Sequence, residues 1–179
     1  MNFNHVLFIF ICDSSHIKYI LKNNTLILGL GNDILSDDRI GHQLVRDLAN
    51  HLNSDDLHLD VAASGGFEIV EYLKDFKKVI ILDAIRTQTG KPGDIYCFIP
   101  SDFTDSRYLP SFHDIDFLTA MKLSNTLSSG LPEIHIIAIE ILEGMVFSEE
   151  LTPPMKERYG EILEKVTELI KGIIEINKN

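Results

Sequence analysis

The spacing of apolar and polar positions changes several times along the chain from residue 25 onward. Continuous apolar runs between turn residues are typical of buried strands, whereas apolar residues that recur every three or four positions indicate helices. This pattern predicts strands at 25–30, 57–63, 78–85, 94–99 and 134–141. It predicts helices at 40–52, 67–73, 115–127 and 155–174.

The alternation of strands and helices predicts an α/β fold. Strands that are connected through helices pair in parallel, and the helices then cover both faces of the sheet. We therefore expect a three-layer sandwich built on a mostly parallel, twisted sheet. Residues 102–112 show little periodicity and are expected to form a long loop. No linker or internal repeat divides residues 25–179, which predicts a single domain.

Residues 1–24 are treated as an N-terminal extension. Its apolar run, Val6–Cys12, follows no Lys or Arg and precedes no small-x-small cleavage site, which argues against a secretory signal. Three alternatives stay open for this run. It could add an edge strand to the sheet, serve as an interaction segment, or be a translated upstream stretch outside any core.

The charge balance narrows the classes of partner. The chain has 16 Lys and Arg against 27 Asp and Glu, which gives a formal charge of −11. Affinity for a phosphate backbone comes largely from basic residues, so we expect no nucleic-acid partner. No apolar run approaches the roughly 20 residues of a membrane-spanning helix, so no membrane partner is expected. Cys12 and Cys97 form no CxxC pair, which favours a reducing, cytoplasmic location.

Candidate chemistry gathers at the carboxyl ends of the predicted strands, where ligands bind in sheets of this kind. Asp38 follows the first strand, Asp83 lies near the end of the third, and His113 follows the irregular loop. Two carboxylates and an imidazole suit a divalent cation such as nickel or zinc, or general acid–base catalysis. The simpler alternatives are that Asp38 caps a helix, Asp83 binds backbone amides, and His113 is a solvated or structural residue.

The stretch Gly29-Leu30-Gly31 raises a nucleotide-binding alternative. The full GxGxxG fingerprint needs Gly or Ala at position 34, where this chain has Ile34. The sequence contains no P-loop and no GxSxG elbow. A nucleotide site therefore stays a minor hypothesis.

Several motifs, taken in order, resemble those of the hydrogenase maturation endopeptidases. They are Leu28–Asn32 (LGLGN), Leu35–Asp38 (LSDD), Ile40-Gly41, Ile80–Ala84 (IILDA), Lys91–Ile95 (KPGDI), Ser111–Asp114 (SFHD), Leu131–Ile134 (LPEI), Ile137–Glu140 (IAIE), Glu143-Gly144 and Phe147-Ser148. The resemblance covers about residues 25–172. This family removes the C-terminal extension of the [NiFe]-hydrogenase large subunit after nickel insertion, on a phosphorylase/hydrolase-like α/β fold.

The resemblance implies a set of site residues and a partner. The catalytic, metal-contacting positions of the family fall on Asp38, Asp83 and His113. The nickel would be supplied by the large-subunit precursor, and zinc or another divalent cation could act as a surrogate. The cleft for the substrate tail would be shaped by Gly31, Asn32, Ser64, Gly65 and Gly66.

Two departures from the family pattern keep other functions open. Arg39 stands where the family has Gly or Ala, and Val61 stands where it has an acid, with Asp60 one place earlier. These changes motivate the alternative of a non-proteolytic binding or assembly factor on the same fold. A small-molecule hydrolase is a further alternative.

Overall fold

The computed structural model describes residues 25–52, 56–63, 67–103 and 132–175. Several sequence predictions lie outside these ranges. They are the extension at 1–24, most of the loop at 102–112, the helix at 115–127, and the site residues Ser64, Gly65, Gly66 and His113.

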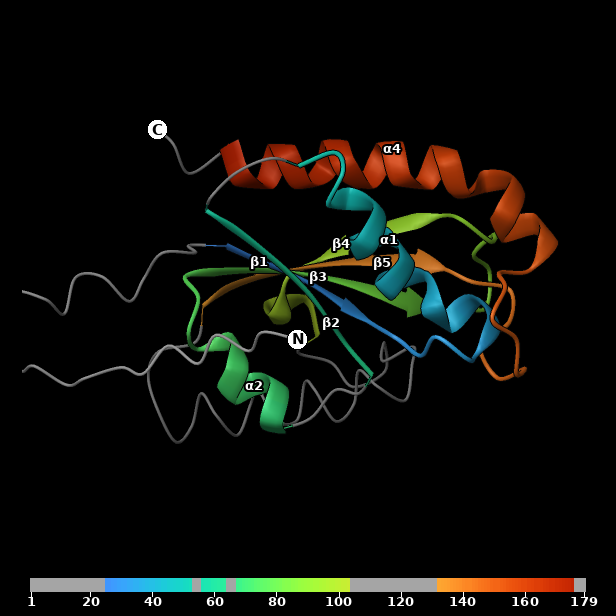
Figure 1. The fold of residues 1–179 in the computed structure, drawn as a ribbon, viewed down its shortest axis with the longest axis horizontal. Coiled ribbons are helices and arrows are strands. Elements are labelled where there is room, and N and C mark those ends of the chain that lie inside the picture. Colours follow the sequence, from blue (N-terminus) through green and yellow to red (C-terminus); the bar gives the residue numbers. More distant parts are fainter. Residues whose placement is uncertain (1–24, 53–55, 64–66, 104–131, 176–179) are drawn as a thin grey trace, which may run out of the picture.

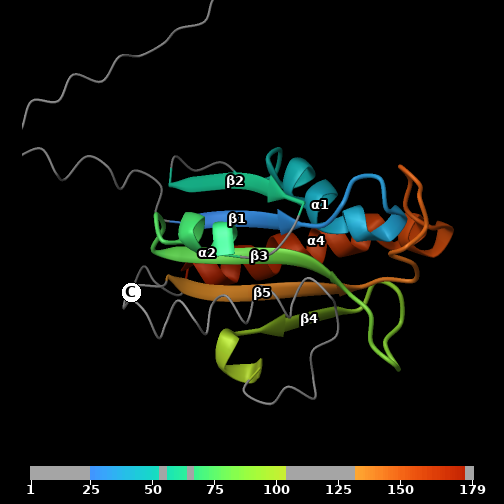
Figure 2. The same ribbon diagram turned by 90° about the horizontal axis from the view of Figure 1, so that it is seen from below.

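A five-stranded sheet forms the centre of the fold, with strand order β2-β1-β3-β5-β4. The strands are β1 (Thr25–Leu30), β2 (Leu57–Ala62), β3 (Lys78–Ile85), β4 (Ile95–Phe98) and β5 (Glu133–Glu140). Neighbouring strands from β2 to β5 pair in parallel, and only β4 is antiparallel, in register with β5. Figure 2 shows the strands side by side in this order. The predicted mostly parallel sheet is confirmed.

The direction of β4 follows from the short connection that precedes it. The eight strand residues of β3 end at Ile85, and the chain reaches Ile95 through a turn that contains no helix. A parallel return requires a crossover of a dozen or more residues, usually helical. The chain therefore cannot return to the amino-terminal ends of the parallel strands. It begins β4 at their carboxyl ends, and β4 runs antiparallel to β5.

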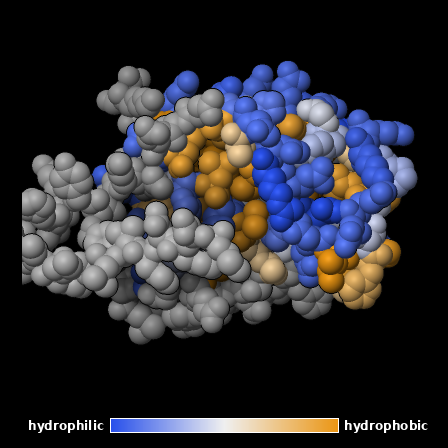
Figure 3. Space-filling model, viewed as in Figure 1, coloured by the Kyte–Doolittle hydropathy of each residue, from blue (hydrophilic) through white to orange (hydrophobic). Residues whose placement is uncertain are grey.

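Helices cover both faces of the sheet, as predicted (Figure 1). One face is packed by α1 (Ile40–Leu48) and α4 (Pro153–Glu175), and the other by α2 (Phe67–Leu73). Alternate residues of each strand serve the two layers: in β3, Ile80 and Leu82 face α1 and α4, whereas Val79 and Ile81 face α2. The outward side of α4 is mostly hydrophilic, and it is blue along the top of Figure 3.

Helix α1 is shorter than the predicted 40–52. It ends at Leu48, and the following residues continue as turns in which Ala49 N–H donates to the Val45 carbonyl and His51 N–H to that of Leu48. Leu52 is nevertheless buried, so the apolar spacing persisted past the end of the helix.

Within the four described ranges, no helix is long and apolar enough to cross a membrane.

Two glycines let α1 approach the sheet backbone directly. A Cβ atom on Gly41 would lie 2.3 Å from the Leu30 carbonyl oxygen and 2.5 Å from that of Leu82. A Cβ atom on Gly29 would lie 2.4 Å from the Gly41 carbonyl oxygen. These separations are far below van der Waals contact, so both positions require glycine. The start of α1 is thereby held against β1 and β3 near their carboxyl ends.

Replacement of Gly41 by Ala should destabilise the fold. The added methyl group would force α1 away from β1 and β3, and overpacking of this kind costs about 1–3 kcal/mol or more. Gly160→Ala is the matched control, because Gly160 lies in α4 with nothing within 4 Å of an added Cβ. That substitution should raise the free energy of unfolding by up to about 1 kcal/mol. Urea unfolding of both variants measures the difference, and equal midpoints would contradict the packing argument.

Candidate active site

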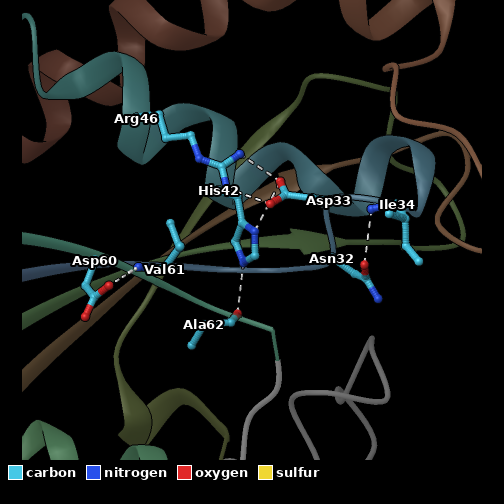
Figure 4. Close-up of polar contacts among 8 residues, drawn as sticks. All are labelled: Asn32, Asp33, Ile34, His42, Arg46, Asp60, Val61 and Ala62. Atoms are coloured by element: carbon cyan, nitrogen blue, oxygen red, sulfur yellow. Dashed lines mark hydrogen bonds and ion pairs between the residues drawn. The ribbon is translucent and has the colours of Figure 1, made fainter. Parts of the chain in front are cut away.

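The loop after β1 folds back tightly on itself and carries the first candidate acid. Gly31 has φ of +142°, and a Cβ atom there would lie 2.0 Å from the Asp38 carbonyl oxygen. Asn32 closes the next turn, since its Oδ1 accepts a hydrogen bond from the Ile34 N–H at 3.1 Å (Figure 4). The contacts of Gly31 and Asn32 in the described residues thus serve to position the loop. Their proposed contact with a substrate tail stays a prediction.

Asp38 lies in a short 3₁₀ helix, η2 (Ser36–Arg39), and is 8% exposed. The N-cap position of α1 is Arg39, one residue after Asp38. The Asp38 side chain lies beside the loop after β5. A Cβ atom placed on Gly144 would be 3.8 Å from the Asp38 Cβ and 4.0 Å from its Oδ1.

Asp83 is 3% exposed and lies two residues before the end of β3, opposite Ala138 of β5. Its Oδ1 accepts a hydrogen bond from the Ala84 N–H at 2.8 Å. The backbone-amide interpretation of Asp83 is thus confirmed for one oxygen, and it is compatible with a metal contact because a carboxylate has several acceptor positions. Gly41 packs on the Leu82 carbonyl, so the segments that carry Asp38 and Asp83 are in contact.

The complete proposed triad is not within the described part of the chain, because His113 lies outside it. Among the residues that the structure does describe, no group of three His, Cys, Asp or Glu side chains is arranged to hold a metal ion. The structure brings Asp38 and Asp83 to the carboxyl edge of the sheet, as the sequence predicted.

Asp37 is an organising residue that sequence reasoning missed. It is completely buried, and its carboxylate accepts hydrogen bonds from the N–H groups of Leu142 (3.3 Å), Glu143 (3.1 Å) and Thr152 (2.7 Å) and from Thr152 Oγ1 (2.8 Å). Its own N–H donates to the Glu143 carbonyl at 3.0 Å. The loop after β1 and the loop after β5 are therefore bound together through one carboxylate.

Glu140, at the end of β5, holds a second loop at the same edge. It is 2% exposed, and its two oxygens accept hydrogen bonds from the Thr87 N–H at 2.7 Å and from Thr87 Oγ1 at 2.9 Å. Gly90 packs against this carboxylate so closely that a Cβ atom would lie 2.2 Å from Oε2. The polar residue at the end of a buried apolar run was the available signal for Glu140.

A charged cluster joins the loop after β1 to the end of β2. Arg46 of α1 donates two hydrogen bonds to Asp33, at 2.8 and 2.6 Å, and His42 Nδ1 lies 3.3 Å from Asp33 Oδ1 (Figure 4). The hydrogen bonds from Arg46 are the main cause that holds the pKa of Asp33 well below its usual range, and the neighbouring His42 lowers it further. His42 Nε2 lies 3.0 Å from the Ala62 carbonyl, which can only accept, so this nitrogen carries the proton.

Asp60, which precedes the departure at Val61, has hydrogen-bond partners within the fold. Asp60 Oδ1 accepts from the Val61 N–H at 2.8 Å, and Oδ2 accepts from the Tyr72 hydroxyl at 3.0 Å. Burial and then the Asp60 contact raise the pKa of Tyr72 to about 12. The half-buried Arg39 lies close enough to Glu150 to help lower the pKa of that carboxyl, although Lys156 is the main cause.

Comparison with known proteins identifies relatives across most of the chain. The family model described as "Hydrogenase maturation protease" matches residues 43–169. The hydrogenase 2 maturation protease of Escherichia coli is 26% identical over 146 residues, which cover 79% of this chain and 87% of that protein.

Solved structures show the same fold. The [NiFe] hydrogenase maturation protease HybD from Thermococcus kodakarensis has a TM-score of 0.63 at 26% identity, covering 82% of this chain and 98% of its own. The hydrogenase maturating endopeptidase HybD from E. coli has a TM-score of 0.65 at 22% identity, covering 83% and 93%.

Removal of the Asp37 carboxylate should loosen both loops at once. Asp37→Ala leaves four donors without their acceptor, and we expect the free energy of unfolding to fall by about 3 kcal/mol or more. Hydrogen exchange of the Leu142, Glu143 and Thr152 amides should become faster. The control, Glu149→Ala, changes an exposed acid of the same loop and should stay within about 0.5 kcal/mol of the wild type. Unchanged exchange in Asp37→Ala would contradict the assigned role.

Replacement of Arg46 by Gln should have an effect that depends on pH. Because the folded-state pKa of Asp33 is depressed, its stabilisation is present above the usual value of 3.8 and is lost as the pH falls below it. Both side chains are more than a third exposed (49% and 40%), so solvent screening limits the effect to at most about 1 kcal/mol. Urea unfolding at pH 6 and pH 3 should give a larger difference from the wild type at pH 6. Lys171→Gln, which removes the same charge from the exposed end of α4, should show no such trend.

Proposed function

The match to the family model over residues 43–169 shows that the chain belongs to the hydrogenase maturation protease family, and we propose that it removes the C-terminal extension of a nickel-loaded [NiFe]-hydrogenase large-subunit precursor. Asp38, Asp83 and His113 are its proposed metal-contacting residues. The observation that carries the assignment of residues is the pair of buried acids at one edge of the sheet. Asp38 and Asp83 are 8% and 3% exposed, on segments that pack together through Gly41.

The proposed role of these acids is to recognise the metal that the precursor presents. Charged carboxylates are rarely this buried without a structural or functional role, because burial disfavours the charged form. Carboxylate oxygens and an imidazole are ligands that nickel accepts, so the site can bind a precursor whose metal is in place. The nickel of the precursor would supply the Lewis acidity that polarises a carbonyl or a water. Cleavage would then depend on prior metal insertion.

The described part of the chain favours water over a cysteine as the attacking group. Cys97 lies on β4, and burial raises the pKa of its thiol, which disfavours the reactive thiolate. Its partner in the register is Ile137 of β5, which pairs in turn with Leu82 of β3, so Cys97 is separated from the strand that carries Asp83 by the whole of β5. The role left to this chain is to orient the precursor and to hold its nickel beside the scissile bond.

The substrate tail is proposed to pass between the loop after β1 and the end of β2. His42 anchors the Ala62 carbonyl and faces Asp33, so these two segments keep a fixed separation (Figure 4). Ser64, Gly65 and Gly66 follow this anchored end, and Gly31 and Asn32 belong to the facing loop.

The proposed compartment is the cytoplasm, which the two cysteines without CxxC spacing favour.

The alternatives of a non-proteolytic assembly factor and a small-molecule hydrolase receive no support from the relatives, whose names are those of proteases. Arg39, which motivated the first of them, lies near Glu150 on the neighbouring loop. Because Arg39 has Glu150 as an acidic neighbour, its positive charge beside Asp38 is compatible with a metal contact there.

A cleavage assay with nickel-loaded precursor tests the proposed residues. Asp38→Asn, Asp83→Asn and His113→Ala each remove a metal-contacting group, and we expect kcat/KM to fall about 100-fold or more. Glu157→Gln, an exposed acid on α4, should cleave at the wild-type rate. Loss of the C-terminal tail is followed by mass spectrometry, with nickel-free precursor as a substrate control that should stay intact. Failure of the wild type to cleave a confirmed cognate precursor would contradict the function, whereas full activity in all three variants would contradict only the residue assignment.

A further inference from the structure

Exposed apolar side chains gather on one side of the candidate site. Among the residues that the structure describes, six large apolar residues are exposed, and five of them lie on the loops after β1 and β5. We call these five the apolar rim: Ile34 (48% exposed), Leu142 (45%), Met145 (77%), Val146 (54%) and Phe147 (80%). Figure 3 shows this region as an orange patch at the lower right, where the loop after β5 turns.

The loop that carries the apolar rim is held in a defined shape. Asp37 accepts hydrogen bonds from Leu142 and Glu143 at its start and from Thr152 at its end. Between these anchors, the chain pairs with the loop after β1, since Ser148 N–H donates to the Ile34 carbonyl at 3.0 Å. An apolar surface on a preorganised loop loses little conformational entropy on binding, which favours a docking role.

The apolar rim is continuous with the proposed metal contact. Gly144 immediately precedes Met145 and packs beside the Asp38 side chain. A Cβ atom placed on Gly144 would lie 3.8 Å from the Asp38 Cβ. A protein that brings its metal to Asp38 must therefore come close to Met145 and Phe147. The loop also carries the exposed acid Glu149, whereas the neighbouring Glu150 is paired with Lys156, so the facing surface should combine apolar residues with a basic one beside them.

We propose that the apolar rim is the docking surface for the large-subunit precursor, and that it binds an apolar patch with a basic neighbour beside the C-terminal extension. This inference rests on the proposed function. Phe147 and Met145 are the anchors, because they are the most exposed and because large apolar side chains dominate binding at interfaces. The rim supplies affinity for the folded precursor, while Asp38 and Asp83 read its metal.

The test compares a double variant, Met145→Ser with Phe147→Ser, against Ile99→Ser. Ile99 is the matched control, since it is 44% exposed and follows β4, whose end lies at the amino-terminal ends of the parallel strands. For the double variant we expect KM for the nickel-loaded precursor and its Kd, measured by biolayer interferometry, to rise about tenfold or more, with kcat within twofold of the wild type. The control should change neither constant. Phe147→Leu, which keeps an apolar anchor, should retain most of the affinity.

Each other outcome has a defined meaning. Unchanged KM and Kd in the double variant, with the wild type active, would overturn the docking surface and leave the proposed function standing. A lower sedimentation coefficient with unchanged KM would overturn it in favour of self-association. If the wild type binds the precursor without cleaving it, loss of binding in the double variant still supports the rim while the proposed function fails. No binding by the wild type would overturn both proposals.

Discussion

The direct contact between the backbone of α1 and the backbones of β1 and β3 is the constraint on which the site depends. Gly29 and Gly41 permit this contact, because any side chain at either position would overlap a carbonyl group of the facing segment. Gly31 continues the same packing into the next turn, where it lies under the Asp38 carbonyl. The position of Asp38, the first proposed metal ligand, therefore depends on glycine at positions 29, 31 and 41.

Two neighbouring aspartates divide structural and functional work at this position. Asp37 binds three backbone amides and a hydroxyl, and so joins two loops that are more than a hundred residues apart in sequence. Asp38 faces Gly144 across the junction that Asp37 creates. A change in Asp37 would displace Asp38, so mutational loss of activity at residue 37 reports positioning and not contact with the metal.

Much of the fold could be predicted because buried parallel strands are apolar throughout. The run at 78–85 coincides with β3, and the positions of Asp38 and Asp83 followed from where the strands end. The roles of Asp37 and His42 were missed because their partners include backbone groups of distant loops, which leave no pattern in the sequence. The spacing near Leu52 predicted too long a helix, since burial continued after the helical turns had ended. Ser64, Gly65, Gly66 and His113 lie outside the described residues, so their roles stay predictions.

The high exposure of Met145 and Phe147 also has an evolutionary consequence. Side chains that are 77% and 80% exposed contribute little to the folded core, whereas the loop beneath them is held by the buried Asp37. Substitutions at the tip can therefore accumulate at almost no expense in stability, even though the chemistry beside them cannot change. A duplicated copy of such an enzyme could acquire a new protein client through a few surface residues and keep its ancestral reaction.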